Sequence, residues 1–173
     1  MLSHPHRASF PDAVRYLGLA TVTPSSFNPD HDPDGAQIQA LFQNLRGALD
    51  DAGLPYHELV GISFPADEFV PPQQINYVAA LAHDDAVING MTEVIVPAGD
   101  YFVATYQGPL STFDAAVNDF YMTLVPASGY APRDGYHLEK YPSTWRGRPT
   151  DTMQLMLPIA AELITGGNDA APQ

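Results

Sequence analysis

Cysteine is absent from the 173 residues of this sequence. Without thiols the chain can form neither a disulfide framework nor a cysteine-ligated zinc site, and it has no thiolate nucleophile. Basic residues are scarce as well: seven Lys and Arg stand against twenty Asp and Glu, which leaves a formal net charge of -13 at pH 7. So negative a chain repels phosphate backbones and anionic lipid headgroups. We therefore expect no direct nucleic-acid binding and no membrane partner.

Long hydrophobic runs are also missing. No segment approaches the roughly eighteen apolar residues of a membrane-spanning helix, and the first ten residues, MLSHPHRASF, lack the apolar core of a secretion signal. We expect a cytoplasmic protein. With 45% hydrophobic residues, the chain is long enough for one core and short for two domains. The sequence predicts one domain over residues 1–164 and a flexible C-terminal tail at 165–173.

The sequence contains none of the common catalytic or cofactor motifs. It has no Gly-x-Ser-x-Gly elbow, no phosphate-binding loop and no Gly-x-Gly-x-x-Gly turn. Its six histidines do not have the spacing of established metal sites, and the segment 31–34 (HDPD) is interpreted as a turn before a helix. We predict neither a metal nor a cofactor, so any catalysis would have to use carboxylates and phenols with water.

Two segments have apolar residues at every third or fourth position, which is the spacing of one helix face. They cover residues 38–52 and 113–124. Gly53 follows the first segment and Pro126 the second, and each is expected to end its helix. The other apolar residues fall in short runs bounded by Pro, Gly or Asp, which is typical of strands. The predicted strands are 16–23, 59–64, 75–82, 92–96, 101–107, 137–141 and 152–157.

The two halves of the chain are weakly similar. Arg15–Pro24 (RYLGLATVTP) aligns with Asp100–Pro109 (DYFVATYQGP), and each precedes a predicted helix. After the helices, Gln74–Ala82 aligns with Asp151–Ile159. The order strand, helix, strand, strand therefore occurs twice.

One such unit leaves part of its helix and sheet uncovered, so two units packed about a pseudo-two-fold axis would close a common core. The predicted halves are about 12–90 and 91–164. We predict an α+β fold built from a duplicated strand-helix-strand-strand unit, with an antiparallel sheet and two helices flanking a ligand cleft. Clefts at such junctions are where ligands usually bind.

Several motifs of the second half resemble, in order and spacing, those of the GyrI-like effector-binding family. The resemblance extends from about Tyr16 to Ile159. The motifs are Val96–Tyr101 (VPAGDY), Gly108-Pro109 before the second helix, Ser128–Tyr130 (SGY), His137–Pro142 (HLEKYP) and Gln154–Ile159 (QLMLPI).

This resemblance implies a ligand-binding module of the kind that AraC-type and MerR-type transcription regulators carry next to DNA-binding helices. Only some fifteen residues precede the first predicted strand, too few for a helix-turn-helix, so we expect a stand-alone module. Stand-alone members of the family bind several drugs, inhibit gyrase or hydrolyse electrophilic cyclopropane-bearing toxins. We favour a small-molecule-binding protein that captures hydrophobic compounds, aromatic or cationic, in a cleft with a buried glutamate. A hydrolase and an acidic protein-interaction module, such as a gyrase inhibitor, are the alternatives.

Glu139 is the first candidate site residue, and it is aligned with the apolar Ile62 of the first half. The resemblance places it in the family's Glu-x-Tyr strand. A carboxylate buried there would have a raised pKa and would attract cations or, in an enzyme, serve as the catalytic base that activates water. The strand pattern alone also allows an exposed glutamate that pairs with Lys140 or Arg133.

Strand alternation supplies the next candidates. Met153, Leu155 and Leu157 point to one side of their strand and are assigned to the core, which directs Gln154 and Met156 to the cleft.

Aromatic side chains complete the predicted site. Trp145, the sole tryptophan, lies in the loop 142–149 and either closes over a ligand or caps the core. His137 shares the face of Glu139 by alternation. The predicted ligand-binding set is Glu139, Tyr77, Tyr106, Phe64, Tyr141, Trp145, Gln154 and Met156.

Overall fold

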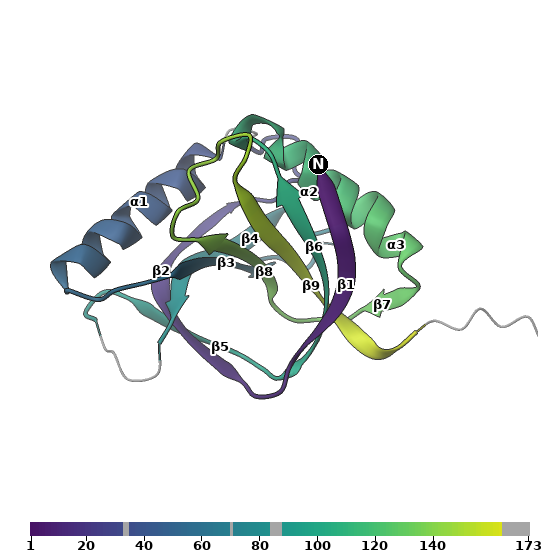
Figure 1. The fold of residues 1–173 in the computed structure, drawn as a ribbon, viewed down its shortest axis with the longest axis horizontal. Coiled ribbons are helices and arrows are strands. Elements are labelled where there is room, and N and C mark those ends of the chain that lie inside the picture. The colour runs from purple at the N-terminus through teal and green to yellow at the C-terminus, as the bar shows by residue number, and fades with distance from the viewer. Residues whose placement is uncertain (33–34, 70, 84–87, 164–173) are drawn as a thin grey trace, which may run out of the picture.

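An antiparallel sheet with two helical segments on one face makes up the part of the chain that the structure describes (Figure 1). The structure is a computed structural model that describes residues 1–32, 35–69, 71–83 and 88–163. The predicted α+β fold class is confirmed. The predicted tail at 165–173 lies outside the described residues. Among those residues, every helix is too short or too polar to span a lipid bilayer.

The strands run antiparallel to their neighbours in the order β1-β6-β9-β8-β3-β4-β2-β5, and β7 pairs with β9. Their bounds are β1 (Leu2–Phe10), β2 (Val14–Pro24), β3 (Glu58–Pro65), β4 (Gln74–Ala82), β5 (Thr92–Val96), β6 (Gly99–Gln107), β7 (Tyr130–Pro132), β8 (His137–Pro142) and β9 (Thr152–Leu163). The first helix is α1 (Ala36–Asp51). The second helical segment comprises a 3-10 turn (Leu110–Thr112), α2 (Phe113–Asp119), a π turn (Phe120–Leu124) and α3 (Val125–Ala127).

The predicted duplication is confirmed, and three further strands, β1, β5 and β7, are added to the repeated units. The core strands β2, β3 and β4 of the first half meet β6, β8 and β9 of the second where β3 pairs with β8. The strand β1 crosses over to pair with β6, and β5 pairs with β2. The sequence analysis missed β1 because Leu2 and Phe10 are its only large apolar residues and most of this edge strand is exposed.

The helices end differently from one another. As predicted, α1 stops just before Gly53, which adopts a left-handed conformation with φ 66°. The prediction that Pro126 ends the second helix is wrong, because the helical segment continues to Ala127. A proline inside a helix removes one N–H donor. A π turn ends at Leu124, immediately before α3, so the hydrogen-bonding pattern of the helical segment changes just before Pro126.

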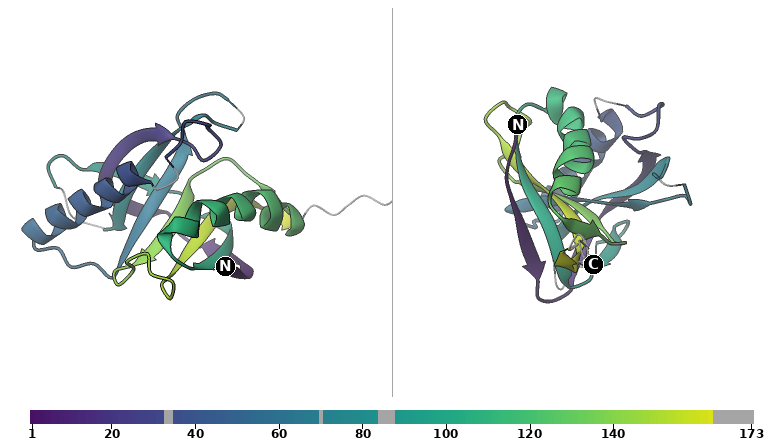
Figure 2. Two further views of the ribbon diagram at one scale, coloured as in Figure 1. Left: turned by 90° about the horizontal axis from the view of Figure 1, so that it is seen from above. Right: turned by 90° about the vertical axis from the view of Figure 1, so that its right-hand side faces the viewer.

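Both helices pack on the same face of the sheet, as expected (Figure 2). Leu45 and Leu49 of α1 and Phe120 of the second segment share one buried cluster with the strand residues on that side. The opposite face forms a second cluster, to which β2, β3, β5 and β6 contribute Tyr16, Ile62, Val96 and Tyr101. Residues near both edges of the sheet therefore meet in one core, so the sheet must be strongly curved (Figure 1).

The register of the strands corrects the alignment of the two halves by one residue. Thr21 pairs with Tyr77 in the first half, and Tyr106 pairs with Met153 in the second. Thr21 and Tyr106 are aligned positions, so Tyr77 corresponds to Met153 and not to Gln154. A shift of one residue moves every side chain of a strand to the other face. Met156 accordingly lies in the cluster on the face away from the helices.

Candidate functional site

A cavity of about 310 Å³ lies between α1 and the second helical segment, over the middle of the sheet. Both halves of the chain contribute to it, as expected for a cleft at the junction of a duplicated fold. Its walls include Ile38, Phe42, Gln43 and Arg46 of α1, Leu110, Phe113 and Val117 of the second helical segment, and Tyr77, Glu139, Tyr141 and Trp145 from the sheet and the loop after β8.

Glu139 lies at the sheet side of this cavity and accepts two hydrogen bonds at one carboxylate oxygen. The Tyr77 hydroxyl donates to Oε2 across 2.5 Å and the Tyr141 hydroxyl across 2.6 Å. Among the described residues nothing donates to the other oxygen, Oε1. The alternative pairing with Lys140 or Arg133 is not formed: Lys140 pairs with Glu58 at 3.2 Å, and Arg133 Nε donates to a backbone carbonyl oxygen.

Gly61 creates the space for this arrangement. It pairs directly with Glu139 across the β3–β8 junction. It is also the residue of the first half that corresponds to Glu139, because Val60 pairs with Ala80 in the same way as Leu138 pairs with Met156. A Cβ at Gly61 would overlap the Tyr77 hydroxyl. The counterpart of the glutamate is therefore a glycine and not Ile62, and it leaves room for the Tyr77 hydroxyl next to the carboxylate.

The local environment changes the pKa of Glu139 and of the two tyrosines that donate to it, Tyr77 and Tyr141. Burial raises the pKa of Glu139, although the hydrogen bonds from Tyr141 and Tyr77 favour the carboxylate and oppose this shift. Burial, and secondarily the charge of Glu139, raises the pKa of Tyr77 and of Tyr141 well above 10. The phenols therefore keep their protons and act as donors. Glu139 is the group whose charge can respond to a ligand.

Aromatic rings surround the carboxylate. The Tyr141 ring packs edge-on against Phe42, with 5.2 Å between centroids, and against Trp145, with 4.9 Å. Phe42 also packs against Tyr77 at 6.3 Å. Edge-to-face pairs of this kind hold rings in defined positions. The cavity therefore presents flat apolar walls beside one acidic group.

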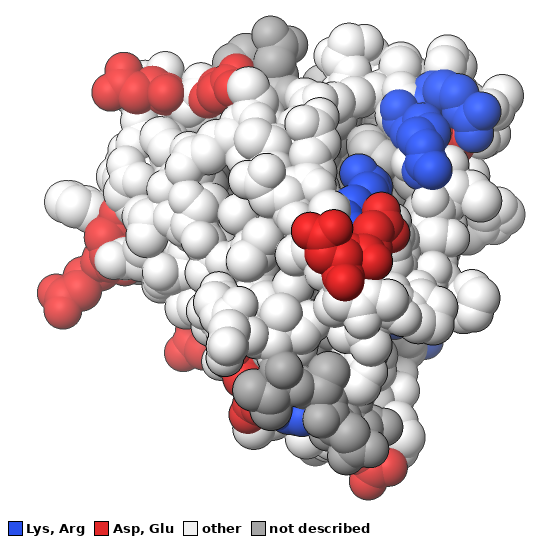
Figure 3. Space-filling model, turned by 90° about the vertical axis from the view of Figure 1, so that its left-hand side faces the viewer, with Lys and Arg blue, Asp and Glu red and all other residues white. Residues whose placement is uncertain are grey.

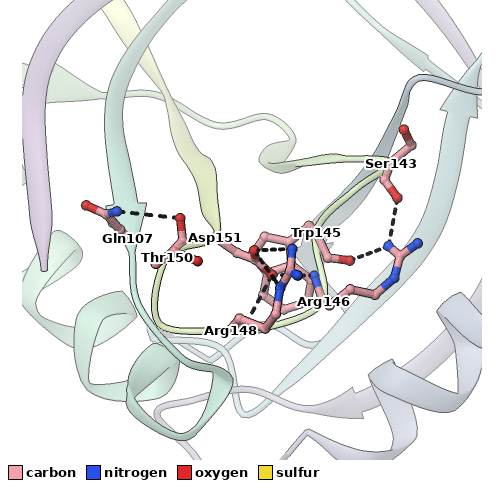
Figure 4. A network of polar contacts seen from close by, with 7 residues as sticks. All are labelled: Gln107, Ser143, Trp145, Arg146, Arg148, Thr150 and Asp151. Atoms are coloured by element: carbon pink, nitrogen blue, oxygen red, sulfur yellow. Dashed lines mark hydrogen bonds and ion pairs between the residues drawn. The ribbon is translucent and has the colours of Figure 1, made fainter.

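Asp151 organises the loop that carries Trp145 to the cavity (Figure 4). Its carboxylate accepts the backbone N–H groups of Arg146 and Arg148 at 2.6 and 3.1 Å and pairs with the Arg148 guanidinium at 2.9 Å. The hydrogen bond from Arg148 and its positive charge lower the pKa of Asp151 to about 2. The Arg146 guanidinium donates to the carbonyl oxygens of Ser143 and Trp145. The sequence analysis recognised the loop but missed this aspartate.

A second polar pair joins His137, two residues before Glu139 on β8, to Tyr121 of the second helical segment. The Tyr121 hydroxyl is 2.7 Å from Nδ1 of His137, and the two rings stack. Burial lowers the pKa of His137 from 6.5 to about 4, and burial together with the charge of Glu139 raises the pKa of Tyr121. His137 does share the face of Glu139, but its partner is a helix tyrosine, so we infer that it is neutral in the folded protein near pH 7.

We expect this neutral histidine to make stability depend on pH. Below pH 6.5 the unfolded chain binds a proton at His137, whereas the folded protein does so only near pH 4. The free energy of unfolding should therefore fall by about 1–2 kcal/mol between about pH 7.5 and about pH 5. Urea titrations at both pH values measure this fall.

The control for this prediction is His137→Gln, which keeps a polar partner for Tyr121 without titrating. The raised pKa of Glu139 acts in the opposite direction and is common to both proteins. The lowered pKa of Asp151 matters only near and below about pH 4. An equal pH dependence in the variant and the wild type would show that His137 is not responsible.

Four residues of the predicted set lie outside the lining of the cavity. The Tyr106 hydroxyl donates to the carbonyl oxygen of Pro109 at 2.6 Å and supports the start of the second helical segment. Phe64 packs against Tyr136 on the opposite face of the sheet. Gln154 and Met156 lie on β9. With the alignment of the two halves corrected by one residue, both side chains belong to the face away from the helices. The cavity brings together Glu139, Tyr77, Tyr141 and Trp145. The ligand-binding role of all eight stays a prediction.

The helix walls of the cavity, and the contact between His31 and Asp114, were not predicted. Helical periodicity placed Phe42 in the apolar stripe of α1, but it could not show that Arg46, one turn later, faces the cavity. Among the lining residues, His31 Nε2 is 3.2 Å from an Asp114 oxygen, so the two halves are joined there. Asp32 accepts the Ala36 N–H at 2.8 Å at the start of α1.

Comparisons with known proteins agree with this architecture. The family model described as the GyrI-like small molecule binding domain matches residues 11–160. No curated protein sequence matches the chain detectably.

Several solved structures share the fold at low sequence identity. SAV2435 bound to tetraphenylphosphonium gives a TM-score of 0.69 at 11% identity, with 92% of this chain and 95% of that chain covered. The C-terminal domain of EcmrR gives 0.66 at 13%, with 91% and 97% covered. A hydrolase from Listeria innocua gives 0.54 at 14%, with 90% and 91% covered. At these identities the likeness shows a common fold.

Proposed function

Because this chain belongs to the GyrI-like small-molecule-binding family, with the match covering residues 11–160, we propose that its cavity captures hydrophobic compounds that are aromatic or cationic. The observation that carries the proposal is the carboxylate of Glu139, which faces a cavity walled by aromatic rings. Tyr77 and Tyr141 hold its Oε2 and leave Oε1 without a donor among the described residues.

The charge of the ligand follows from the state of Glu139. A carboxylate with a raised pKa is poorly solvated, and a bound cation would favour its charged form. The faces of Trp145 and the tyrosines would add cation–π attraction. SAV2435, whose structure contains the hydrophobic cation tetraphenylphosphonium, shares the fold and illustrates such a ligand.

On one face of the protein the charged side chains are scattered. On the face drawn in Figure 3, acidic side chains lie at several separate places and most of the surface is uncharged. A continuous acidic strip would be needed to imitate nucleic acid, and this face does not present one. We place the preference for cations in the cavity, at Glu139.

Trp145 provides the test. It is the only tryptophan of the chain and it lines the cavity, so its fluorescence should report occupancy. We expect the cationic dye thioflavin T to bind more tightly than the anionic dye anilinonaphthalene sulfonate by about tenfold or more at low salt, because hydrogen-bonded and ionic contacts of a charged group contribute about 1.5–3 kcal/mol. Equal affinities for the two dyes would contradict the role of the carboxylate.

A hydrolase is the second candidate, and one observation favours it. The unpaired Oε1 of Glu139 is free to take a proton from water, while the Tyr77 and Tyr141 hydroxyl groups keep the carboxylate in place. Water activated in this way could open a strained, electrophilic cyclopropane. Mass spectrometry after incubation with such a compound would show a ring-opened product with water added. Recovery of the unchanged compound would leave binding alone.

A further inference from the structure

The two oxygens of Glu139 have different surroundings. Oε2 accepts the hydroxyl groups of Tyr77 and Tyr141, and a Cβ at Gly61 would come within 2.9 Å of it. Oε1 has no donor among the described residues. Some unpaired polar atoms of this structure have almost no accessible surface, but Oε1 is not one of them. Because Glu139 is only partly buried and lines the open cavity, Oε1 is the carboxylate atom that a ligand can reach.

This difference decides where a proton binds to Glu139. In a neutral carboxylic acid the carbonyl oxygen has two lone pairs, and the other oxygen carries the proton. The hydroxyl groups of Tyr77 and Tyr141 occupy both lone pairs of Oε2, so the proton of the neutral acid belongs on Oε1. The neutral side chain then presents an O–H donor to the cavity. The ionised side chain presents a negatively charged acceptor at the same position.

The surroundings of the carboxyl group make its neutral form accessible. Burial raises the pKa of Glu139, although the hydrogen bonds from Tyr141 and Tyr77 oppose this shift. The two phenols stay protonated, because their own pKa values lie well above 10. No ion pair neutralises Glu139 within the described part of the chain. A carboxylic acid kept neutral in this way can donate a hydrogen bond to a ligand.

Other ionisable groups face the cavity or lie close to Glu139, and their titration has to be separated from that of Glu139. Those that line the cavity besides the two tyrosines are His31, Asp32, Arg46, Asp114 and Arg146. Near Glu139, His137 has a pKa of about 4 and the pKa of Tyr121 is raised, so both are neutral between about pH 5 and about pH 8. Histidine is the residue type that ordinarily titrates in this range. His31 therefore needs a control variant.

We infer that a single proton on Oε1 of Glu139 decides which class of ligand the cavity binds: the ionised form binds aromatic cations, and the protonated form binds neutral aromatic compounds with a hydrogen-bond acceptor such as a carbonyl oxygen. The inference rests on the proposed function and adds a second ligand class to it. A cation competes with the proton for the same oxygen, whereas a neutral acceptor needs the proton. The affinities for the two classes should therefore respond to pH in opposite directions.

Two dyes with the same tricyclic ring system test this inference. N-methylacridinium is a permanent cation, and N-methylacridone is neutral and carries a carbonyl oxygen. Cation binding favours the carboxylate and releases protons, so N-methylacridinium should bind about threefold or more weakly at about pH 5 than at about pH 8. N-methylacridone binding takes up protons and should become about threefold or more tighter over the same change. Fluorescence titrations give the affinities, and calorimetry in buffers of different ionisation enthalpy gives the sign of the proton exchange.

Glu139→Gln should reproduce the protonated form at every pH. Tyr77 and Tyr141 would hold the amide oxygen in the position of Oε2, which places the amide NH2 donor in the position of Oε1. We expect the variant to bind N-methylacridone at least as tightly as the wild type does at about pH 5, and without pH dependence. N-methylacridinium should bind weakly at both pH values. The control is His31→Gln, in which the opposite pH trends should persist because Glu139 is retained.

The outcomes separate this inference from the proposed function. If N-methylacridinium binds but acidification does not increase the affinity for N-methylacridone, or if Glu139→Gln keeps the pH dependence, the role of the proton is refuted while the proposed function stands. Proton exchange of the same sign for both dyes would refute it on the wild type alone. If neither dye binds the wild type at either pH, both are refuted. Loss of the opposite trends in His31→Gln would assign them to His31 and overturn the inference.

Discussion

Replacing Glu139 with glutamine is expected to weaken the binding of a cationic dye by about 10- to 100-fold, since it removes a charge–charge contact of about 1.5–3 kcal/mol. The amide oxygen of Gln can still accept both phenol hydrogen bonds, because Tyr77 and Tyr141 donate to the same oxygen, Oε2. Shape and hydrogen bonding are therefore kept while the charge is lost. Titration with thioflavin T measures the affinity.

Stability should respond in the opposite direction. A carboxyl group with a raised folded-state pKa stabilises the protein below its unfolded pKa and loses that contribution as the pH rises. At neutral pH the charged form is therefore a cost, which the neutral amide avoids. We expect the melting temperature of Glu139→Gln to hold or rise. If the carboxylate is not part of the site, its removal will leave the dye affinity unchanged.

Glu58→Gln is the matched control for this variant. Glu58 lies on β3, the strand that pairs with β8, and forms an exposed ion pair with Lys140. The substitution removes the same charge outside the lining of the cavity. We expect unchanged dye affinity and a stability change within about 0.5 kcal/mol. A loss of affinity in this control would show that net charge, rather than the position of Glu139, decides binding.

Replacing Gly61 with alanine is expected to lower the free energy of unfolding by about 1–3 kcal/mol, the usual cost of an extra carbon in a packed core. The added Cβ would overlap the Tyr77 hydroxyl and approach the Glu139 carboxylate. The tyrosine would have to move, which would weaken its hydrogen bond to Oε2 and with it the binding of the cationic dye. Urea titration and dye titration measure the two effects.

Gly47→Ala is the control, because it makes the same chemical change at an exposed position of α1. A Cβ at Gly47 would meet no atom within 4 Å. Alanine is the better helix former, so this variant should be more stable than the wild type by about 0.5–1 kcal/mol. If Gly61→Ala were as stable as Gly47→Ala, the close approach of β3 to Tyr77 and Glu139 would not constrain the site.

Local patterns in the sequence determined the two helices, the order of the elements and every strand of the described chain except β1 and β7. The apolar period of α1 and its end before Gly53 depend on residues within a few positions of one another, and so do the short apolar runs of the strands. The duplication was visible for the same reason. The edge strand β1 was missed because it pairs with β6 and buries little of its own surface, so no local pattern marks it.

Part of the site was also predictable. Glu139 and Tyr141 alternate along one short strand, and Tyr77 and Trp145 were expected near them. Only the tertiary structure shows that these four side chains line one cavity. It also shows that Gln154 and Met156 lie outside the lining of that cavity. An alignment wrong by one residue reverses the direction of every side chain in a strand, and the apolar pattern of β9 fits either direction.

Only the tertiary structure decided the arrangement of charge in the cavity. Gly61 meets Glu139 because β3 pairs with β8 across the junction of the two halves, 78 positions apart in the sequence (139 − 61). Arg46 faces the same cavity from α1. A sequence shows which residues can carry charge, but their burial and their pairing depend on contacts between distant segments, which exist only after the chain has folded.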